Sequence, residues 1–321
     1  MIFIVSRNHQ AGFGPAYGLD ADRLLGSLKR FGQGVNVQAR AWGVAAVIGS
    51  AVGFGAMAIF ARQAYADGAD VTAVLFLRFL IAGLLMALLM VAGRRPWPRP
   101  FAIGILTLMG GGIYVLQSFS FFKALQYASA GLVGLLLYLY PFLVTVFGAL
   151  LFREPLGVKR FTAVCLALAG TALTLWGGIS GSAAGVAFGV IAALLYSAYI
   201  LVGSRILKNE EPFGAAAVVM LSAAAVFGVT VAIGEPAFPQ SAAGWQAIVA
   251  IAVFSTVIAI VGFFIGMRIL GAADASTLST LEPVVTIALA AIFLGERLQP
   301  VQLIGAAVVL GAVVWLTRIR S

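Results

Sequence analysis

Two stretches of this chain repeat one another: FFKALQYASAGLVGLLLYLYPFLVTVFGALLFREPL at residues 121–156 and FFIGMRILGAADASTLSTLEPVVTIALAAIFLGERL at residues 263–298. They keep a constant offset of 142 residues, the separation of Pro141 from Pro283. Chance matches among apolar residues are common in so apolar a sequence, but a matched proline is not. The same offset aligns further pairs: Phe121 with Phe263, Leu139 with Leu281, Glu154 with Glu296, Leu156 with Leu298, and 43–45 with 185–187.

The composition places the chain in a membrane. Of its 321 residues 62% are hydrophobic and 10% are charged, and the mean hydropathy is +1.07. Soluble domains are about 45–50% apolar and about 25% charged. A soluble enzyme, a nucleic-acid module and a fibrous protein are therefore excluded, although the net charge of +9 alone is typical of nucleic-acid binding.

Apolar runs recur along the chain from Trp42 onward, separated by short polar breaks such as 93–100 and 210–212. A membrane-spanning helix needs about 20 apolar residues, and charges and prolines end such helices. We predict an all-α integral membrane protein with ten transmembrane helices. The expected spans are 42–61, 72–92, 101–122, 129–151, 161–177, 184–203, 214–233, 245–267, 274–294 and 300–317.

The basic residues predict the orientation of these spans. With ten spans, 16 of the 20 Lys and Arg fall on the side of both termini, 3 fall on the opposite side and Arg78 lies within a span. Because Lys and Arg favour cytoplasmic loops, we predict that the N and C termini are cytoplasmic. Residues 1–41 form a basic cytoplasmic tail with a short helix at 20–31, either solvated or in contact with anionic headgroups. Its apolar run, Ile2 to Val5, is too short for a secretory signal.

The repeat divides the rest of the chain into two halves, 42–180 and 181–321, of five spans each. Because five is odd, the second half enters the membrane from the opposite side. The halves are then related by a pseudo-two-fold axis in the membrane plane. Inverted repeats of this kind are typical of alternating-access transporters, which bind substrate near the midplane between the halves.

Several short motifs carry a family resemblance. They are LFLRFLIA at 75–82 with Arg78, ALQYASA at 124–130 before Pro141, FREPL at 152–156, LGAADAS at 270–276, Glu282-Pro283 and LGERL at 294–298. In these the chain resembles the drug/metabolite transporter superfamily, specifically its EamA-type ten-helix exporters. The resemblance implies a bacterial inner-membrane exporter of amino acids or hydrophobic metabolites. It also implies a central cavity lined by the first four helices of each half, with the fifth and tenth helices outside it.

Glu282 is the leading candidate for the binding site. Ionisable residues inside a membrane are costly and mark function by default. Ser279, Glu282 and Thr286 share one helical face, because they are spaced by three and four residues. The carboxylate is suited to a substrate ammonium or to proton coupling, while uncoupled facilitation is equally compatible. The alternative is a protonated glutamic acid that bonds a neighbouring helix.

Arg78 is the second charged candidate, and its repeat equivalent is Met220. A guanidinium binds a carboxylate with two hydrogen bonds, which suits the acid end of an amino acid. The alternative is a fixed strut that reaches outward to pair with Asp67 or Asp70.

Tyrosines and polar residues predict the wall of the site. Tyr114, Gln117 and Ser118 lie on one face of the third span. Tyr138 and Tyr140 in the fourth span and Tyr196 and Tyr199 in the sixth add aromatic contacts, although each tyrosine alone also fits plain packing.

Glycine and proline predict where the spans are interrupted. Pro141 and Pro283 interrupt equivalent spans and are candidate hinges, the alternative being a packing role. The glycines at 110–112 are expected to loosen the third span. Small residues in the fifth span, including Gly170, favour close packing within the chain.

The residue inventory limits the chemistry. Cys165 is the single cysteine and His9 the single histidine, so we expect no metal and no cofactor. The sequence has no Walker loop, HExxH or GxSxG. We therefore predict a secondary transporter, not an enzyme, that exports small amphipathic metabolites, chiefly amino acids including hydrophobic and aromatic ones. Its partners are a small-molecule substrate and the lipid bilayer, without nucleic acid, and a monomer suffices. The alternatives are a sugar-phosphate or nucleotide-sugar antiporter and an intramembrane lipid-processing enzyme.

Overall fold

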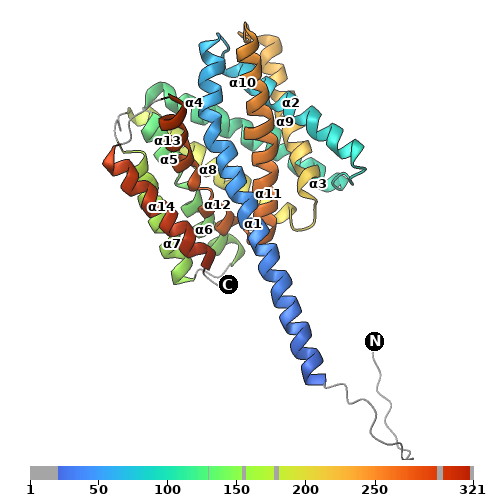
Figure 1. Cartoon of the computed structure of the whole chain (residues 1–321). Helices are drawn as coiled ribbons and strands as arrows, with labels where there is room; N and C mark the ends of the chain where they lie inside the picture. Colours follow the sequence, from blue (N-terminus) through green and yellow to red (C-terminus); the bar gives the residue numbers. More distant parts are fainter. Residues whose placement is uncertain (1–20, 129, 154–156, 177–180, 295–298, 319–321) are drawn as a thin grey trace, which may run out of the picture. The chain divides into compact units, whose positions relative to one another are not determined.

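The computed structural model describes residues 21–128, 130–153, 157–176, 181–294 and 299–318. In these ranges every named element is a helix, and one isolated bridge joins Ala128 to Gly181. The prediction of an all-α protein is confirmed. In chain order (Figure 1) the elements are α1 Ala21–Ala66, α2 Val71–Ala92, α3 Pro100–Thr107, η1 Leu108–Tyr114, α4 Val115–Tyr127, α5 Ala130–Leu137, α6 Tyr140–Phe152, α7 Val158–Thr174, α8 Ala183–Ile206, α9 Pro212–Ile233, α10 Ala242–Ala252, η2 Val253–Ile258, α11 Ala259–Leu270, α12 Ala272–Leu278, α13 Leu281–Leu294 and α14 Pro300–Arg318.

Helix α1 is longer than the sequence predicts. It runs for 46 residues through the expected tail and the first span, so the end predicted for the short helix at Phe31 is wrong. The segment contains no proline, which leaves nothing to stop the helix. The chain divides into two compact units, Met1–Ala39 and Arg40–Ser321, and the repeats lie in the second. The boundaries 42–180 and 181–321 stay a prediction.

Nine helical segments in the described residues are long and apolar enough to cross a membrane. They correspond to all the predicted spans except the fifth, 161–177. That span coincides with α7, which has 17 residues and is shorter than the other nine. The count of ten spans therefore stays a prediction, while the multi-pass helical architecture is confirmed.

Equivalent helices of the two halves pack against each other. Helix α2 lies against α9, and α7 lies against α14 (Figure 1). The members of each pair are related by the offset of the repeat, as expected if an axis passes between them. A side chain at Gly170 or Gly305 has no room, since a Cβ at Gly170 would lie 2.8 Å from the backbone nitrogen of Val309. The close packing predicted for the fifth span is thus made within the chain.

The fourth and ninth spans are each two half-helices. Helix α5 ends at Leu137 and α6 begins at Tyr140, while α12 ends at Leu278 and α13 begins at Leu281. Both predicted spans are thus present, and each is broken just before the proline that was predicted to interrupt it. Pro141 and Pro283 lie in the first turn of the second half-helix, where a missing N–H donor costs nothing.

Two π-helical segments, η1 and η2, interrupt the third and eighth spans. The glycines at 110–112 lie in η1, where the predicted loosening occurs. A Cβ at Gly110 would lie 2.8 Å from the Cα of Val219 in α9, so glycine permits this close approach. In the sequence, the offset of the repeat aligns the end of η1 with η2, and it aligns Tyr114 with Thr256.

Candidate functional site

The two helix breaks meet at a hydrogen bond. Tyr138 lies in the break between α5 and α6, and Glu282 is the second residue of α13, just after the break that follows α12. The Tyr138 hydroxyl donates to Glu282 Oε2 at 3.2 Å. Glu282 is the repeat equivalent of Tyr140. The centre of the site thus holds a carboxylate from one half and tyrosines from the other.

The other residues predicted to share the face of Glu282 are held by backbone contacts. The carbonyl of Ser279, which Pro283 deprives of its usual donor, accepts the N–H of Glu282 at 3.0 Å. This carbonyl therefore still has a hydrogen-bond donor. The Thr286 hydroxyl lies 3.0 Å from the carbonyl oxygen of Gly55 in α1 and 3.0 Å from that of Glu282. These contacts fix the start of α13 against α1.

Five of the predicted tyrosines form one continuous row. The ring centroids of Tyr138 and Tyr140 are 6.1 Å apart, and those of Tyr140 and Tyr196 are 4.7 Å apart. The row continues from Tyr196 to Tyr199 at 6.1 Å and from Tyr199 to Tyr114 at 5.2 Å. Edge-to-face and offset ring pairs at such distances are favourable. The row therefore joins the α5–α6 break, α6, α8 and η1.

Arg78 closes the far end of this row. Its Nε donates to the Thr256 hydroxyl at 2.8 Å, and a terminal nitrogen donates to the Tyr114 hydroxyl at 3.4 Å. The guanidinium also lies 4.8 Å from the centroid of the Phe79 ring. Since Tyr114 and Thr256 are repeat equivalents, one arginine joins matching positions of the two halves.

Arg78 is buried, with 5% of its surface exposed. The alternative in which it pairs with Asp67 or Asp70 is wrong, because both carboxylates bind the loop before α10. Asp70 accepts the N–H of Ala237 at 2.9 Å, and Asp67 accepts those of Gln240 and Ser241 at 2.8 Å each. Within the described residues Arg78 forms no ion pair with a carboxylate. A buried cation without a counter-charge is suited to an anionic ligand group.

Gln117 and Ser118 stand apart from the row. Both are buried in α4, and the Ser118 hydroxyl lies 3.5 Å from Gln117 Oε1. In the part of the chain that the structure describes, no hydrogen bond joins either residue to a tyrosine of the row. Sequence reasoning missed Thr256, although the repeat offset from Tyr114 would have found it.

Loops at both ends of the α2–α9 pair are held by carboxylates. At one end, hydrogen bonds from Ser241 and Gln240 hold the pKa of Asp67 below its usual range. At the other end, Glu211 binds Arg95 at 2.8 Å and Glu210 binds Arg99 at 2.7 Å. Arg95 and Arg99 are the repeat equivalents of Ala237 and Ser241. Both ends of the pair are therefore fixed in the same way. No cluster of potential metal ligands occurs among the described residues.

Comparison with known proteins identifies the chain. The EamA-like transporter family matches residues 41–176 and again 183–318, two ranges that start 142 residues apart. The chain belongs to the EamA-like transporter family. The family match repeats the offset found in the sequence and covers the whole tyrosine row. The family resemblance and the duplication of the fold are thereby confirmed.

Relatives place this family member among transporters. It is 30% identical over 267 residues to the uncharacterized transporter YcbK of Bacillus subtilis. The matched region covers 78% of this chain and 85% of the relative. It is 28% identical over 181 residues to the aromatic amino acid exporter YddG of Ancylobacter novellus, covering 54% and 60%. A crystal structure with 22% sequence identity has the same fold, with a TM-score of 0.77 over 88% of this chain and 99% of that one. The chain is a multi-pass membrane transporter and not an enzyme.

Proposed function

We propose that this transporter exports amphipathic amino acids, including hydrophobic and aromatic ones, across the bacterial inner membrane by alternating access. The observation that carries the proposal is the tyrosine row between a buried guanidinium and a carboxylate. Both termini are cytoplasmic in this proposal, as the distribution of basic residues predicts.

The chemistry of the row fits a zwitterion with an apolar body. The two charged groups lie at opposite ends of the row, whereas the carboxylate and ammonium of an α-amino acid are attached to the same carbon. Each end of the row therefore offers one charged contact: Arg78 binds a carboxylate with two hydrogen bonds, and Glu282 accepts from an ammonium. Tyrosine rings give an apolar surface with a few hydroxyl groups, which is the usual composition of a small-molecule site. Ser279 and Thr286 hold the break beside Glu282. Gln117 and Ser118 lie in α4 apart from the row, and their part in the site stays a prediction.

The same inventory argues against a sugar-phosphate or nucleotide-sugar antiporter. Such substrates carry dense negative charge and require several cations, whereas Arg78 is the sole predicted cation of the site. The name of the YddG relative also favours aromatic amino acids.

Movement is proposed to occur at the paired breaks before Pro141 and Pro283. Irregular backbone inside a membrane is tolerated where it faces protein or a cavity, and broken helices of this kind mark transporter binding sites. Proton coupling would use Glu282, whose partner Tyr138 comes from the opposite half.

The test is flux into proteoliposomes that contain the purified monomer. Radiolabelled phenylalanine, tyrosine and leucine are compared with a nucleotide sugar, and we expect saturable flux of the amino acids alone. Glu282→Gln should abolish any stimulation by a pH gradient, while Glu211→Gln, at the end of the α2–α9 pair, should not. Equal stimulation of wild type and Glu282→Gln would remove proton coupling. Flux of the nucleotide sugar alone would overturn the substrate class.

A further inference from the structure

The first half-helices of the two broken spans, α12 and α5, differ in burial. All residues of α12, from Ala272 to Leu278, are buried, and so are Ser279 and Thr280 in the break that follows. The repeat equivalent of this segment is 130–138, where the side chains described are partly exposed except Val133. Helix α12 packs against α6, α7, α8, α11 and α14, whereas α5 packs against α4 and α8. Protein therefore covers the start of the ninth span more completely than the start of the fourth span. We call the start of the ninth span, at α12, the closed mouth and the start of the fourth span, at α5, the open mouth.

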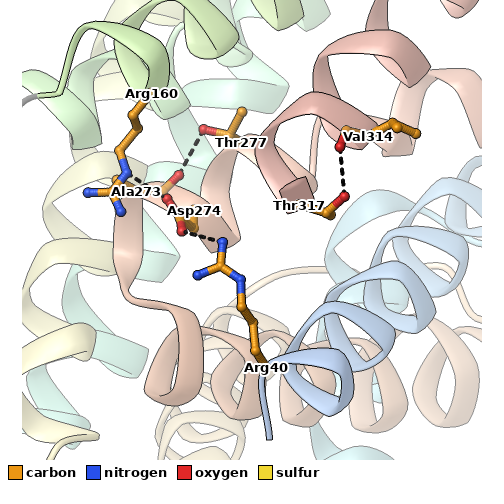
Figure 2. Close-up of polar contacts among 7 residues, drawn as sticks. All are labelled: Arg40, Arg160, Ala273, Asp274, Thr277, Val314 and Thr317. Carbon is orange, nitrogen blue, oxygen red and sulfur yellow. Dashed lines mark hydrogen bonds and ion pairs between the residues drawn. The ribbon is translucent and has the colours of Figure 1, made fainter. Parts of the chain in front are cut away.

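A charged trio lies at the closed mouth. Asp274 in α12 contacts Arg160 in α7 and Arg40 in α1, and Figure 2 shows the two guanidinium groups approaching its carboxylate from different helices. Arg160 Nε lies 2.8 Å from Asp274 Oδ1, and Arg40 lies 3.7 Å from Oδ2. The Asp274 side chain is 4% exposed, against 25% for Arg160 and 29% for Arg40. Both ion pairs therefore join α12 of the second half to the first half, one to α1 at the start of the first span and one to α7 at the start of the fifth span.

The open mouth carries no such charges at the equivalent positions. The offset of the repeat places Leu132 at the position of Asp274, Ser182 at that of Arg40 and Gln302 at that of Arg160. Ser182 caps α8 by accepting the N–H of Gly185 at 3.3 Å, and Gln302 accepts the N–H of Gln299 at 2.9 Å. The trio is thus an asymmetry between two halves that otherwise share their backbone design.

We propose that Asp274, Arg40 and Arg160 form a latch that closes this mouth in the resting transporter, and that substrate must release it. Opening the mouth separates α12 from α1 and α7, so the ion pairs form in one conformation only. The Asp274 carboxylate is buried and pairs with two guanidinium groups that are only partly exposed, which makes the charge-assisted contacts strong. Because the equivalent positions, Leu132, Ser182 and Gln302, carry no charge, the latch favours one conformation over the other. In the orientation proposed above, the latched mouth is cytoplasmic.

The test measures accessibility without substrate, so its failure and the failure of the proposed function are distinguishable. In a Cys165→Ser background, Thr277→Cys places a thiol on the buried α12, and Leu135→Cys places one at the equivalent position of α5. A membrane-impermeant maleimide is applied to right-side-out and inverted vesicles. We expect slow labelling of the thiol at 277 and fast labelling of the thiol at 135.

Asp274→Asn should raise the labelling rate at 277 by about tenfold or more, as loss of a buried charge pair predicts, and should slow labelling at 135. Asp274→Glu should retain slow labelling. Glu211→Gln is the matched control. It also removes a carboxylate that pairs with an arginine, Arg95, but this ion pair lies outside the latch. The latch is refuted if Asp274→Asn leaves both rates unchanged, or if Glu211→Gln raises labelling at 277 as much.

Two further variants keep the test decisive if Asp274→Asn fails to fold. Arg160→Gln alters a partly exposed side chain and should give a smaller increase at 277. The double variant Leu132→Asp with Gln302→Arg places opposite charges at the open mouth, and it should slow labelling at 135 severalfold. Unchanged labelling in both variants would contradict the proposal.

Discussion

The crossing of α7 and α14 allows a prediction with a control on the same helix. A Cβ added at Gly305 would contact the backbone nitrogen of Thr174 and lie 2.7 Å from the carbonyl oxygen of Gly170. The three nearest atoms all belong to the backbone of α7, so the contact cannot be relieved by a change of side-chain rotamer. Gly305→Ala must therefore push the two helices apart. At Gly311, further along α14, a Cβ would meet nothing within 4 Å.

The two substitutions make the same chemical change, so their difference isolates the clash. Replacing a helical glycine by alanine stabilises a helix by about 1 kcal/mol, and this gain applies to both variants. Overpacking a tight contact costs about 1–3 kcal/mol, and this cost applies to Gly305→Ala alone. We expect Gly311→Ala to be neutral or stabilised, and Gly305→Ala to be about 1–3 kcal/mol less stable than it.

The assay is thermal unfolding of the purified variants in one detergent, followed by intrinsic fluorescence. The difference corresponds to a gap in Tm of roughly 2–10 °C between the variants. Equal Tm values for the two variants would show that α7 and α14 do not cross in contact at these glycines. A Gly311→Ala protein as destabilised as Gly305→Ala would show that any added methyl on α14 is harmful, and the crossing argument would fail.

Three more outcomes are expected. Arg78→Met, which copies its repeat equivalent Met220, should weaken amino-acid binding by about tenfold to a hundredfold, because a hydrogen bond to a charged group is worth about 1.5–3 kcal/mol. Scintillation proximity binding should show the loss for phenylalanine and little change for phenethylamine, and equal losses would argue against a carboxylate ligand. Asp67→Asn should lower Tm at pH 7 and make no difference in strong acid. The pKa of Asp67 is lower in the folded protein than in the unfolded chain. The stabilisation by its carboxylate is therefore fully present above the unfolded pKa of about 3.9 and is lost as the pH falls through the folded pKa. An equal decrease in Tm at both pH values would show that the carboxylate charge is not what matters. Gly110→Ala should lower Tm, since its Cβ would contact α9; the control is Gly104→Ala, with nothing within 4 Å, and equal Tm values would exclude the close approach.

Much of the fold could be predicted because it follows from hydropathy and from one offset. The offset identified Pro141 and Pro283 as paired, and the structure breaks both spans just before them. It did not reveal that each span divides into two half-helices, because proline alone does not distinguish a kink from a break. The length of α1 was missed for a related reason: charge in a sequence marks the membrane boundary, not the end of a helix.

The candidate site was partly predictable for a different reason. Glu282 and Arg78 stand out as ionisable groups in apolar runs, and the structure joins both to the tyrosine row. Their partners were not predictable from helical spacing, since Thr256 is 178 residues from Arg78. Asp274 was overlooked because a single acidic residue at the end of a span is unremarkable until α1 and α7 bring arginines to it.

The position of Arg78 explains why the duplicated halves differ there. Arg78 reaches Tyr114 and Thr256, and internal symmetry directs the side chain at 220 toward the same two residues. A second arginine at that position would compete for the same two hydroxyl groups, and it would place two positive charges close together in the buried interior. Gene duplication can copy residues away from the centre without conflict, whereas at this central position the second half carries the fully buried, uncharged Met220 in place of an arginine.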